Sequence, residues 1–146
     1  MNRHYKYYIG IDCGVSTGYS LYHKAERKLI QVSSMGIVDA MDAVQLINLM
    51  HPGELFVRLE DARQRKWIPK QKDEKAERGR NRGAGSVMRD AQIWEEFLDK
   101  YRIPYELVAP KNNKTKLKAD YFKKITGWSL GTNEHGRDAA MLVFGF

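Results

Sequence analysis

The order of strand-like and helix-like segments restricts the fold of this chain more than any other feature. Three segments rich in aromatic and β-branched residues come first, at 5–12, 19–23 and 28–36, and short links between them favour antiparallel pairing. Further strand-like segments at 54–60 and 104–108 each follow a helical pattern. This order predicts an α/β fold: a five-stranded mixed sheet, with three antiparallel strands followed by two parallel ones, flanked by helices.

Two helices are expected between these strands. One runs from Asp39, as its N-terminal cap, to Met50. The other begins at Ser86 and ends near Tyr101, with an apolar stripe that predicts a buried face. The residues of that stripe are Val87, Ala91, Trp94, Leu98 and Tyr101.

Two further helices are expected after the last strand. The first covers 115–126 and closes at Gly127, and a polar loop over 131–136 then leads to a final helix over 137–146. We detect no internal repeat and no interdomain linker, so residues 1–146 are expected to form a single domain.

Composition excludes some locations and classes of protein. No apolar run approaches the roughly 20 residues that span a membrane, so no membrane association is expected. The N-terminal residues do not resemble a secretory signal. Cys13 is the single cysteine, so no intrachain disulfide is possible. We therefore expect a cytoplasmic protein, of a bacterium or of the host cell if a phage encodes it.

Positive charge is concentrated in one segment. The net charge is +7, and residues 63–82 hold nine Lys or Arg against three acids. A basic chain without membrane features is often a polyanion binder. Because residues 61–82 show no clear period, we expect a loop there that a ligand orders, although a solvated surface loop is the alternative.

Asp12 is the first candidate site residue, because it ends the apolar first strand. A carboxylate there costs desolvation energy unless it is paired or binds a cation. Gly14 lets the backbone approach closely, and Thr17-Gly18 leads into the next strand. An ordinary turn aspartate is the alternative interpretation.

Glu60 ends the fourth strand. If that strand lies parallel to the first, Glu60 and Asp12 reach the same edge of the sheet, where functional groups gather. Asp61 is the competing candidate, and the alternation of the strand does not decide between them. We favour Glu60 because it is the terminal residue of the strand.

His135 and Asp138 are three residues apart at the expected start of the last helix, so they share a face. A capping aspartate beside a surface histidine is the alternative. Three carboxylates and one imidazole from distant segments would suit hard divalent cations such as Mg²⁺. Two such ions can clamp the attacking and leaving oxygens of a phosphodiester.

The pattern D-x-G-x-x-T-G at 12–18, the strand-end Glu60 and H-x-x-D at 135–138 resemble the RuvC-like Holliday junction resolvases over nearly the whole chain. The resemblance implies a ribonuclease-H-like fold. It also implies a homodimer that nicks branched DNA with Mg²⁺ or Mn²⁺ bound at Asp12, Glu60, His135 and Asp138. The chain departs from the pattern at Cys13, where proline is usual, and in its long basic segment.

Eleven residues are expected to contact DNA. In the resembling family, basic residues near 111–116 approach the scissile phosphate. Trp67 stacks on or wedges between bases, or else pins its loop to the core. The candidates are Arg63, Arg65, Lys66, Trp67, Lys70, Arg78, Arg80, Arg82, Lys111, Lys114 and Lys116.

Two other functions are compatible with parts of the pattern. A non-catalytic nucleic-acid-binding module of the same fold is the main alternative to a nuclease. An actin-like phosphotransferase also has an acid-Gly-Thr loop after its first strand, but it needs two such domains to enclose a nucleotide, and this chain has 146 residues. We therefore expect no nucleotide cofactor.

Overall fold

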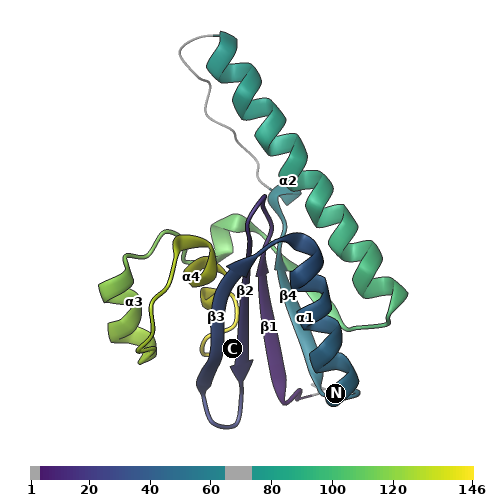
Figure 1. The fold of residues 1–146 in the computed structure, drawn as a ribbon, viewed down its shortest axis with the longest axis vertical. Helices are drawn as coiled ribbons and strands as arrows, with labels where there is room; N and C mark the ends of the chain where they lie inside the picture. Colours follow the sequence, from purple (N-terminus) through teal and green to yellow (C-terminus); the bar gives the residue numbers. More distant parts are fainter. Residues whose placement is uncertain (1–3, 65–73) are drawn as a thin grey trace.

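Five strands form one mixed sheet in the computed structural model, which describes residues 4–64 and 74–146 (Figure 1). The order across the sheet is β3-β2-β1-β4-β5, with β1, β2 and β3 antiparallel and with β4 parallel to both β1 and β5. The predicted α/β fold with its mixed sheet is confirmed. The strands are Tyr7–Asp12 (β1), Thr17–His23 (β2), Lys28–Met35 (β3), Leu55–Glu60 (β4) and Tyr105–Val108 (β5).

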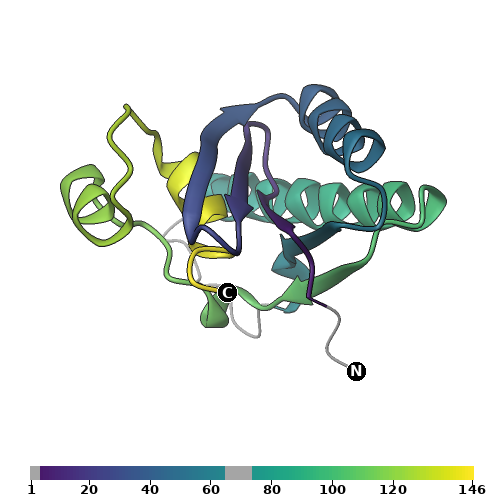
Figure 2. The same cartoon turned by 90° about the horizontal axis from the view of Figure 1, so that it is seen from below.

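Helices cover both faces of the sheet (Figure 2). None of them, within the part of the chain that the structure describes, is long and apolar enough to cross a membrane. The α-helices are Ile37–Met50 (α1), Glu74–Lys100 (α2), Ala119–Thr126 (α3) and Glu134–Met141 (α4), and short 3-10 turns form at Ala62–Gln64 (η1) and Pro110–Asn112 (η2).

Strand alternation divides the core into two layers. Ile9 and Ile11 of β1 face α1 and α2, where they meet the fully buried Trp94. Tyr8 faces the opposite side, toward α3 and α4, where Phe122 is fully buried. Ala91, Trp94 and Leu98 of the predicted stripe are buried and Val87 is partly buried, whereas Tyr101 lies beyond the end of α2 and is exposed.

Helix α2 begins much earlier than predicted, and this corrects two expectations. The loop expected over 61–82 is helical from Glu74, and Ser86 lies inside the helix rather than at its cap. Two arginines and an alanine, which are good helix formers, are among the residues that separate the glycines of this region. Extending a helix that is already packed at Trp94 avoids the cost of nucleation, which offsets the cost of the glycines. The N-terminal half of α2 therefore projects beyond the sheet (Figure 1).

The boundaries of the three other helices also differ from the prediction. Gly36 precedes α1, so Asp39 lies in the first turn, where the helix dipole favours an acid, and is not the cap. Helix α3 begins at Ala119 rather than at 115, because Lys116 adopts a left-handed conformation with φ 58°. Helix α4 begins at Glu134 rather than at 137 and ends at Met141 rather than at 146.

The early start of α4 has a local cause in its cap. The side chain of Asn133 accepts a hydrogen bond from the backbone N–H of Gly136 at 2.8 Å. This bond satisfies one of the free N–H groups of the first turn. Residues 134–136, expected in a loop, are therefore helical, and His135 and Asp138 both lie on α4.

Helix α4 packs directly against the backbone of β1 and β2. A Cβ added to Gly10 would lie 2.0 Å from the carbonyl oxygen of Ala139. A Cβ added to Gly18 would lie 2.0 Å from the carbonyl oxygen of His135. Only glycine fits at these two positions, so they determine how closely the helix approaches the sheet.

We predict that Gly10→Ala lowers the free energy of unfolding by about 3 kcal/mol, because the methyl group must displace the backbone of α4. Urea denaturation of the purified variant measures the change. Gly131→Ala is the matched control, since a Cβ at that position meets nothing within 4 Å. The control should stay within about 0.5 kcal/mol of the parent protein. Equal stability of the two variants would contradict the packing described here.

Candidate active site

The parallel pairing of β1 and β4 places Asp12 and Glu60 side by side. Ile11 of β1 is in register with Leu59 of β4, and Asp12 and Glu60 are the next residues of these two strands. Ile11 and Leu59 point to the α1 and α2 layer, so alternation directs Asp12 and Glu60 to the face that α4 covers.

Helix α4 adds the other two predicted residues at this edge. The imidazole Nδ1 of His135 lies 3.4 Å from Oδ2 of Asp12, and the His135 side chain is half exposed. Asp138, one turn further along the helix, is buried. The two residues share one face of α4, as their spacing predicts.

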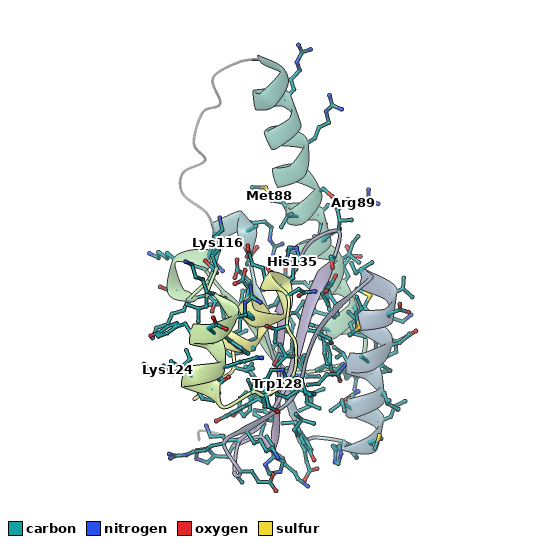
Figure 3. All side chains as sticks on the ribbon, turned by 60° about the vertical axis from the view of Figure 1, so that its left-hand side comes forward. Met88, Arg89, Lys116, Lys124, Trp128 and His135 are labelled. Carbon is teal, nitrogen blue, oxygen red and sulfur yellow. The ribbon has the colours of Figure 1, made fainter. Side chains whose placement is uncertain are left out.

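Asp12, Glu60, His135 and Asp138 line a common hollow of about 200 Å³, named here the acidic hollow. His135 and Lys116 lie at the end of the sheet from which α2 projects (Figure 3). The remaining residues that line the hollow are Cys13, Pro110, Thr115, Lys116 and Glu134.

The carboxylates of the acidic hollow disfavour one another's charge. Burial above all, together with the neighbouring charges of Glu60 and Asp138, raises the pKa of Asp12 to about 7, while His135 opposes them. Burial also raises the pKa of Asp138, against a hydrogen bond from the backbone of Lys116. This is the electrostatic environment that a bound cation would relieve.

Asp61, the competing candidate for Glu60, is engaged elsewhere. Its carboxylate accepts hydrogen bonds from the backbone N–H of Arg63 at 3.1 Å and from Nε of the same residue at 2.7 Å. Burial alone would raise the pKa of Asp61, but these bonds lower it overall. Arg63 also pairs with Glu95 of α2 at 2.5 Å, so Asp61 and Arg63 join the end of β4 to α2. Glu60, and not Asp61, lines the acidic hollow.

Asn113, which no sequence pattern predicted as a site residue, also contacts this site. Its Nδ2 donates to Oε2 of Glu60 at 3.0 Å and to the main-chain oxygen of Asp138 at 3.1 Å. The backbone N–H of Lys116 donates to Oδ1 of Asp138 at 2.8 Å. No motif marks Asn113, because its partners are 53 and 25 residues away in the chain.

The donor set of the acidic hollow has the chemistry that a hard divalent cation prefers, with carboxylate oxygens and one imidazole. Within residues 4–64 and 74–146, no three His, Cys, Asp or Glu side chains are gathered closely enough to form a ready-made metal centre. Mg²⁺ usually binds through one or two carboxylates, with waters and substrate phosphate completing the octahedron. This open group of acids therefore suits Mg²⁺ better than it suits a metal ion whose ligands all come from the protein.

The predicted DNA-contacting residues have different surroundings. The Arg63 guanidinium is engaged by Asp61 and Glu95. Lys111, Lys114 and Lys116 are exposed between β5 and α3, and Lys116 borders the acidic hollow. Arg78 and Arg82 are exposed on the projecting half of α2, and Arg80 is in the same helix. The remaining candidates, Arg65, Lys66, Trp67 and Lys70, lie outside the described residues.

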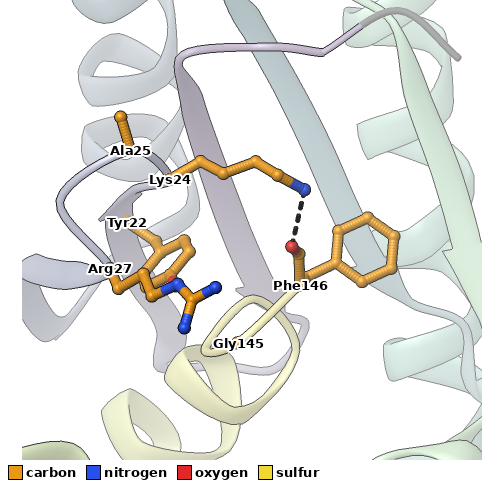
Figure 4. A pocket seen from close by; sticks show the side chains of 6 residues that line it. All are labelled: Tyr22, Lys24, Ala25, Arg27, Gly145 and Phe146. Atoms are coloured by element: carbon orange, nitrogen blue, oxygen red, sulfur yellow. Dashed lines mark hydrogen bonds between the residues drawn. The ribbon is translucent and has the colours of Figure 1, made fainter.

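A second cavity, of about 540 Å³, lies near the opposite end of β2 (Figure 4). The lining residues include Tyr22, Lys24, Arg27 and Phe146, and no carboxylate side chain is among them. Lys24 Nζ donates to the main-chain oxygen of Phe146 at 2.7 Å. This cavity lacks the acids of the first, so it offers no comparable metal chemistry.

Comparison with known proteins bears on the fold. No protein-family model matches the sequence, and no curated protein matches it significantly. A solved structure of T. thermophilus RuvC in complex with a Holliday junction substrate is similar, with a TM-score of 0.53 and 13% identity. The match covers 94% of this chain and 90% of that one. The chain therefore has a RuvC-like fold.

We predict that Asp12→Asn stabilises the metal-free protein at neutral pH. Because the folded-state pKa of Asp12 is about 7 and its ordinary value is 3.8, the parent protein loses stability as pH rises between these values. The asparagine variant lacks this loss, so it should be more stable by on the order of 2 kcal/mol at pH 8. Urea denaturation in EDTA from pH 4 to pH 8 measures the difference, and a difference independent of pH would contradict the assignment.

We predict the opposite result for Asp61→Asn, which should lose about 2 kcal/mol at pH 7 because it weakens a largely buried ion pair with Arg63. Because the pKa of Asp61 is lowered in the folded state, its carboxylate stabilises the fold above about pH 4, and this stabilisation is lost as the pH falls further. The matched control is Glu60→Gln, which should not lower the unfolding midpoint in urea. A larger loss for Glu60→Gln would reverse the roles given to the two acids.

Proposed function

We propose that the protein is a metal-dependent endonuclease that cuts Holliday junctions or other branched DNA. The observation that carries the proposal is the convergence of Asp12, Glu60, His135 and Asp138 on one hollow at the carboxyl ends of parallel strands. The RuvC-like fold supports this function, because the similar RuvC structure holds a Holliday junction substrate.

Asp12, Glu60 and Asp138 would hold Mg²⁺ or Mn²⁺, with His135 as a further ligand or a proton carrier. Two such ions would lower the pKa of the attacking water and stabilise the charge that develops on the leaving oxygen. Asp12 is the central residue, because its carboxylate faces both other acids and His135. Its raised pKa means that cation binding and deprotonation of Asp12 would be coupled.

His135 has a position suited to proton transfer. Its ring lies 3.4 Å from Asp12 and is half exposed, so it can exchange protons with solvent. The Asp12 carboxylate can orient the imidazole through Nδ1, which leaves the other nitrogen for water or for the phosphodiester.

The DNA would extend from the acidic hollow along the projecting half of α2. Arg78 and Arg82 are exposed there, and Lys111, Lys114 and Lys116 are exposed beside the hollow. Cations on two sides of an acidic centre can neutralise phosphates while the acids hold metal. Lys114 and Lys116 are our choices for contact with the scissile phosphate.

We further propose that the protein acts as a homodimer. Symmetric cleavage of a four-way junction requires two equivalent sites, and one chain supplies one acidic hollow of this composition among its described residues. Sedimentation with and without junction DNA tests this part of the proposal.

A non-catalytic DNA-binding module is the second candidate. The observation in its favour is that no three ligand side chains of the described part of the chain form a ready-made metal centre. It differs from the nuclease in one measurable respect, since it predicts junction binding without cleavage in any divalent cation.

The deciding experiment is cleavage of labelled four-way, three-way and flap DNA in Mg²⁺ or Mn²⁺. We predict cleavage by the parent protein and a loss of about a thousandfold or more in Asp12→Asn, with junction binding retained. Asp42→Asn is the matched control, because Asp42 is exposed on α1 outside the acidic hollow. Intact DNA after incubation with folded parent protein, or undiminished cleavage by Asp12→Asn, would overturn the proposal.

A further inference from the structure

We propose that Asn113 is a positioning residue that fixes the Glu60 carboxylate relative to α4. This inference rests on the proposed function, because it assigns a role within the acidic hollow. Asn113 lies between β5 and α3, and its Nδ2 bridges Oε2 of Glu60, at 3.0 Å, and the main-chain oxygen of Asp138, at 3.1 Å. One amide group thus joins the end of β4 to the middle of α4.

The orientation of this amide follows from its partners. Both neighbours are oxygen acceptors, so only the NH₂ group can face them. A reversed amide would place Oδ1 of Asn113 against these two oxygens, with no hydrogen to bond any of the three. The Oδ1 atom of Asn113 is buried, and no hydrogen-bond partner for it is found among the described residues. An unsatisfied buried oxygen does not favour folding, so stability alone does not explain this residue.

The backbone around Asn113 is itself fixed. The N–H of Asn112 donates to the carbonyl of Ala109 at 2.9 Å, and that of Asn113 donates to Pro110 at 3.2 Å. Three residues later, the left-handed backbone of Lys116 presents its N–H to the Asp138 carboxylate at 2.8 Å. The segment therefore holds Glu60 through a side chain and Asp138 through main-chain and side-chain contacts.

A neutral amide suits this role for an electrostatic reason. The two acids at the end of β4 offer an internal comparison, since Asp61 is held by the guanidinium of Arg63, which compensates its charge. Asn113 restrains Glu60 through a neutral amide, which adds no positive charge to the acidic hollow. This hydrogen bond restricts the rotamers available to the Glu60 side chain.

The first test compares Asn113→Ala with its matched neighbour Asn112→Ala. In Asn113→Ala we expect the turnover number to fall, or the Mg²⁺ concentration for half-maximal cleavage to rise, by about tenfold or more. The KM for DNA and the midpoint of urea unfolding should stay near the parent values. Asn112→Ala should behave as the parent protein. Asn113→Asp keeps the side-chain volume but presents only acceptors, so it should be at least as impaired, and it replaces the alanine variant if that variant fails to fold.

A second measurement needs no catalysis. In a ¹⁵N-labelled protein, the side-chain NH₂ resonances of Asn113, assigned by their absence in Asn113→Ala, should exchange slowly with water. They should shift in Glu60→Ala and on addition of Mg²⁺, whereas those of Asn112 should not. Insensitivity to Glu60→Ala, or cleavage by Asn113→Ala with both the turnover number and the Mg²⁺ dependence unchanged, would overturn the positioning role. If the parent protein cuts no DNA while the resonances respond as expected, the positioning contact is supported and the nuclease proposal fails.

Discussion

The direct packing of α4 on the backbone of β1 and β2 is the contact on which the rest of the site depends. At Gly10 and Gly18 the helix carbonyls occupy the space where a Cβ would lie. This close approach brings His135 within 3.4 Å of Asp12, across 123 residues of sequence. Arg58 reinforces the arrangement from the same sheet face, since it donates to the main-chain oxygen of Leu142 and pairs with Glu106 at 2.5 Å.

That arrangement stores unfavourable electrostatic energy at the edge of the sheet. Asp12, Glu60 and Asp138 come together with their charges partly desolvated, and the raised pKa of Asp12 is the consequence. One residue beyond Glu60, Asp61 has a lowered pKa, because Arg63 compensates its charge. Neighbouring acids therefore serve opposite purposes. Asp61 contributes to stability and connects β4 to α2, whereas in the acidic hollow the charges of Glu60 and Asp138 raise the pKa of Asp12.

The similarity to RuvC concerns the fold, whereas the chemistry of the acidic hollow depends on individual side chains of this chain. At 13% identity over most of both chains, the comparison carries the arrangement of strands and helices, and no more. The acids, the histidine and the basic residues beside them belong to this sequence. The fold brings them together because the terminal residues of parallel strands lie at one edge of the sheet, and the helix packed on the adjacent face places its own polar residues at the same edge.

The sequence by itself determined the order of strands and helices along the chain, the mixed sheet, the buried stripe around Trp94 and the candidates Asp12, His135 and Asp138, because local periodicity and strand ends indicate which positions are buried and which lie at an edge of the sheet. Only the tertiary structure decided the extent of α2 and α4, the choice between Glu60 and Asp61 as the acid that lines the hollow, and the contacts of Asn113. A packed helix can extend through glycines that would end it in isolation. Adjacent acids differ only in the partners that distant segments bring to them, and those partners exist only once the chain has folded.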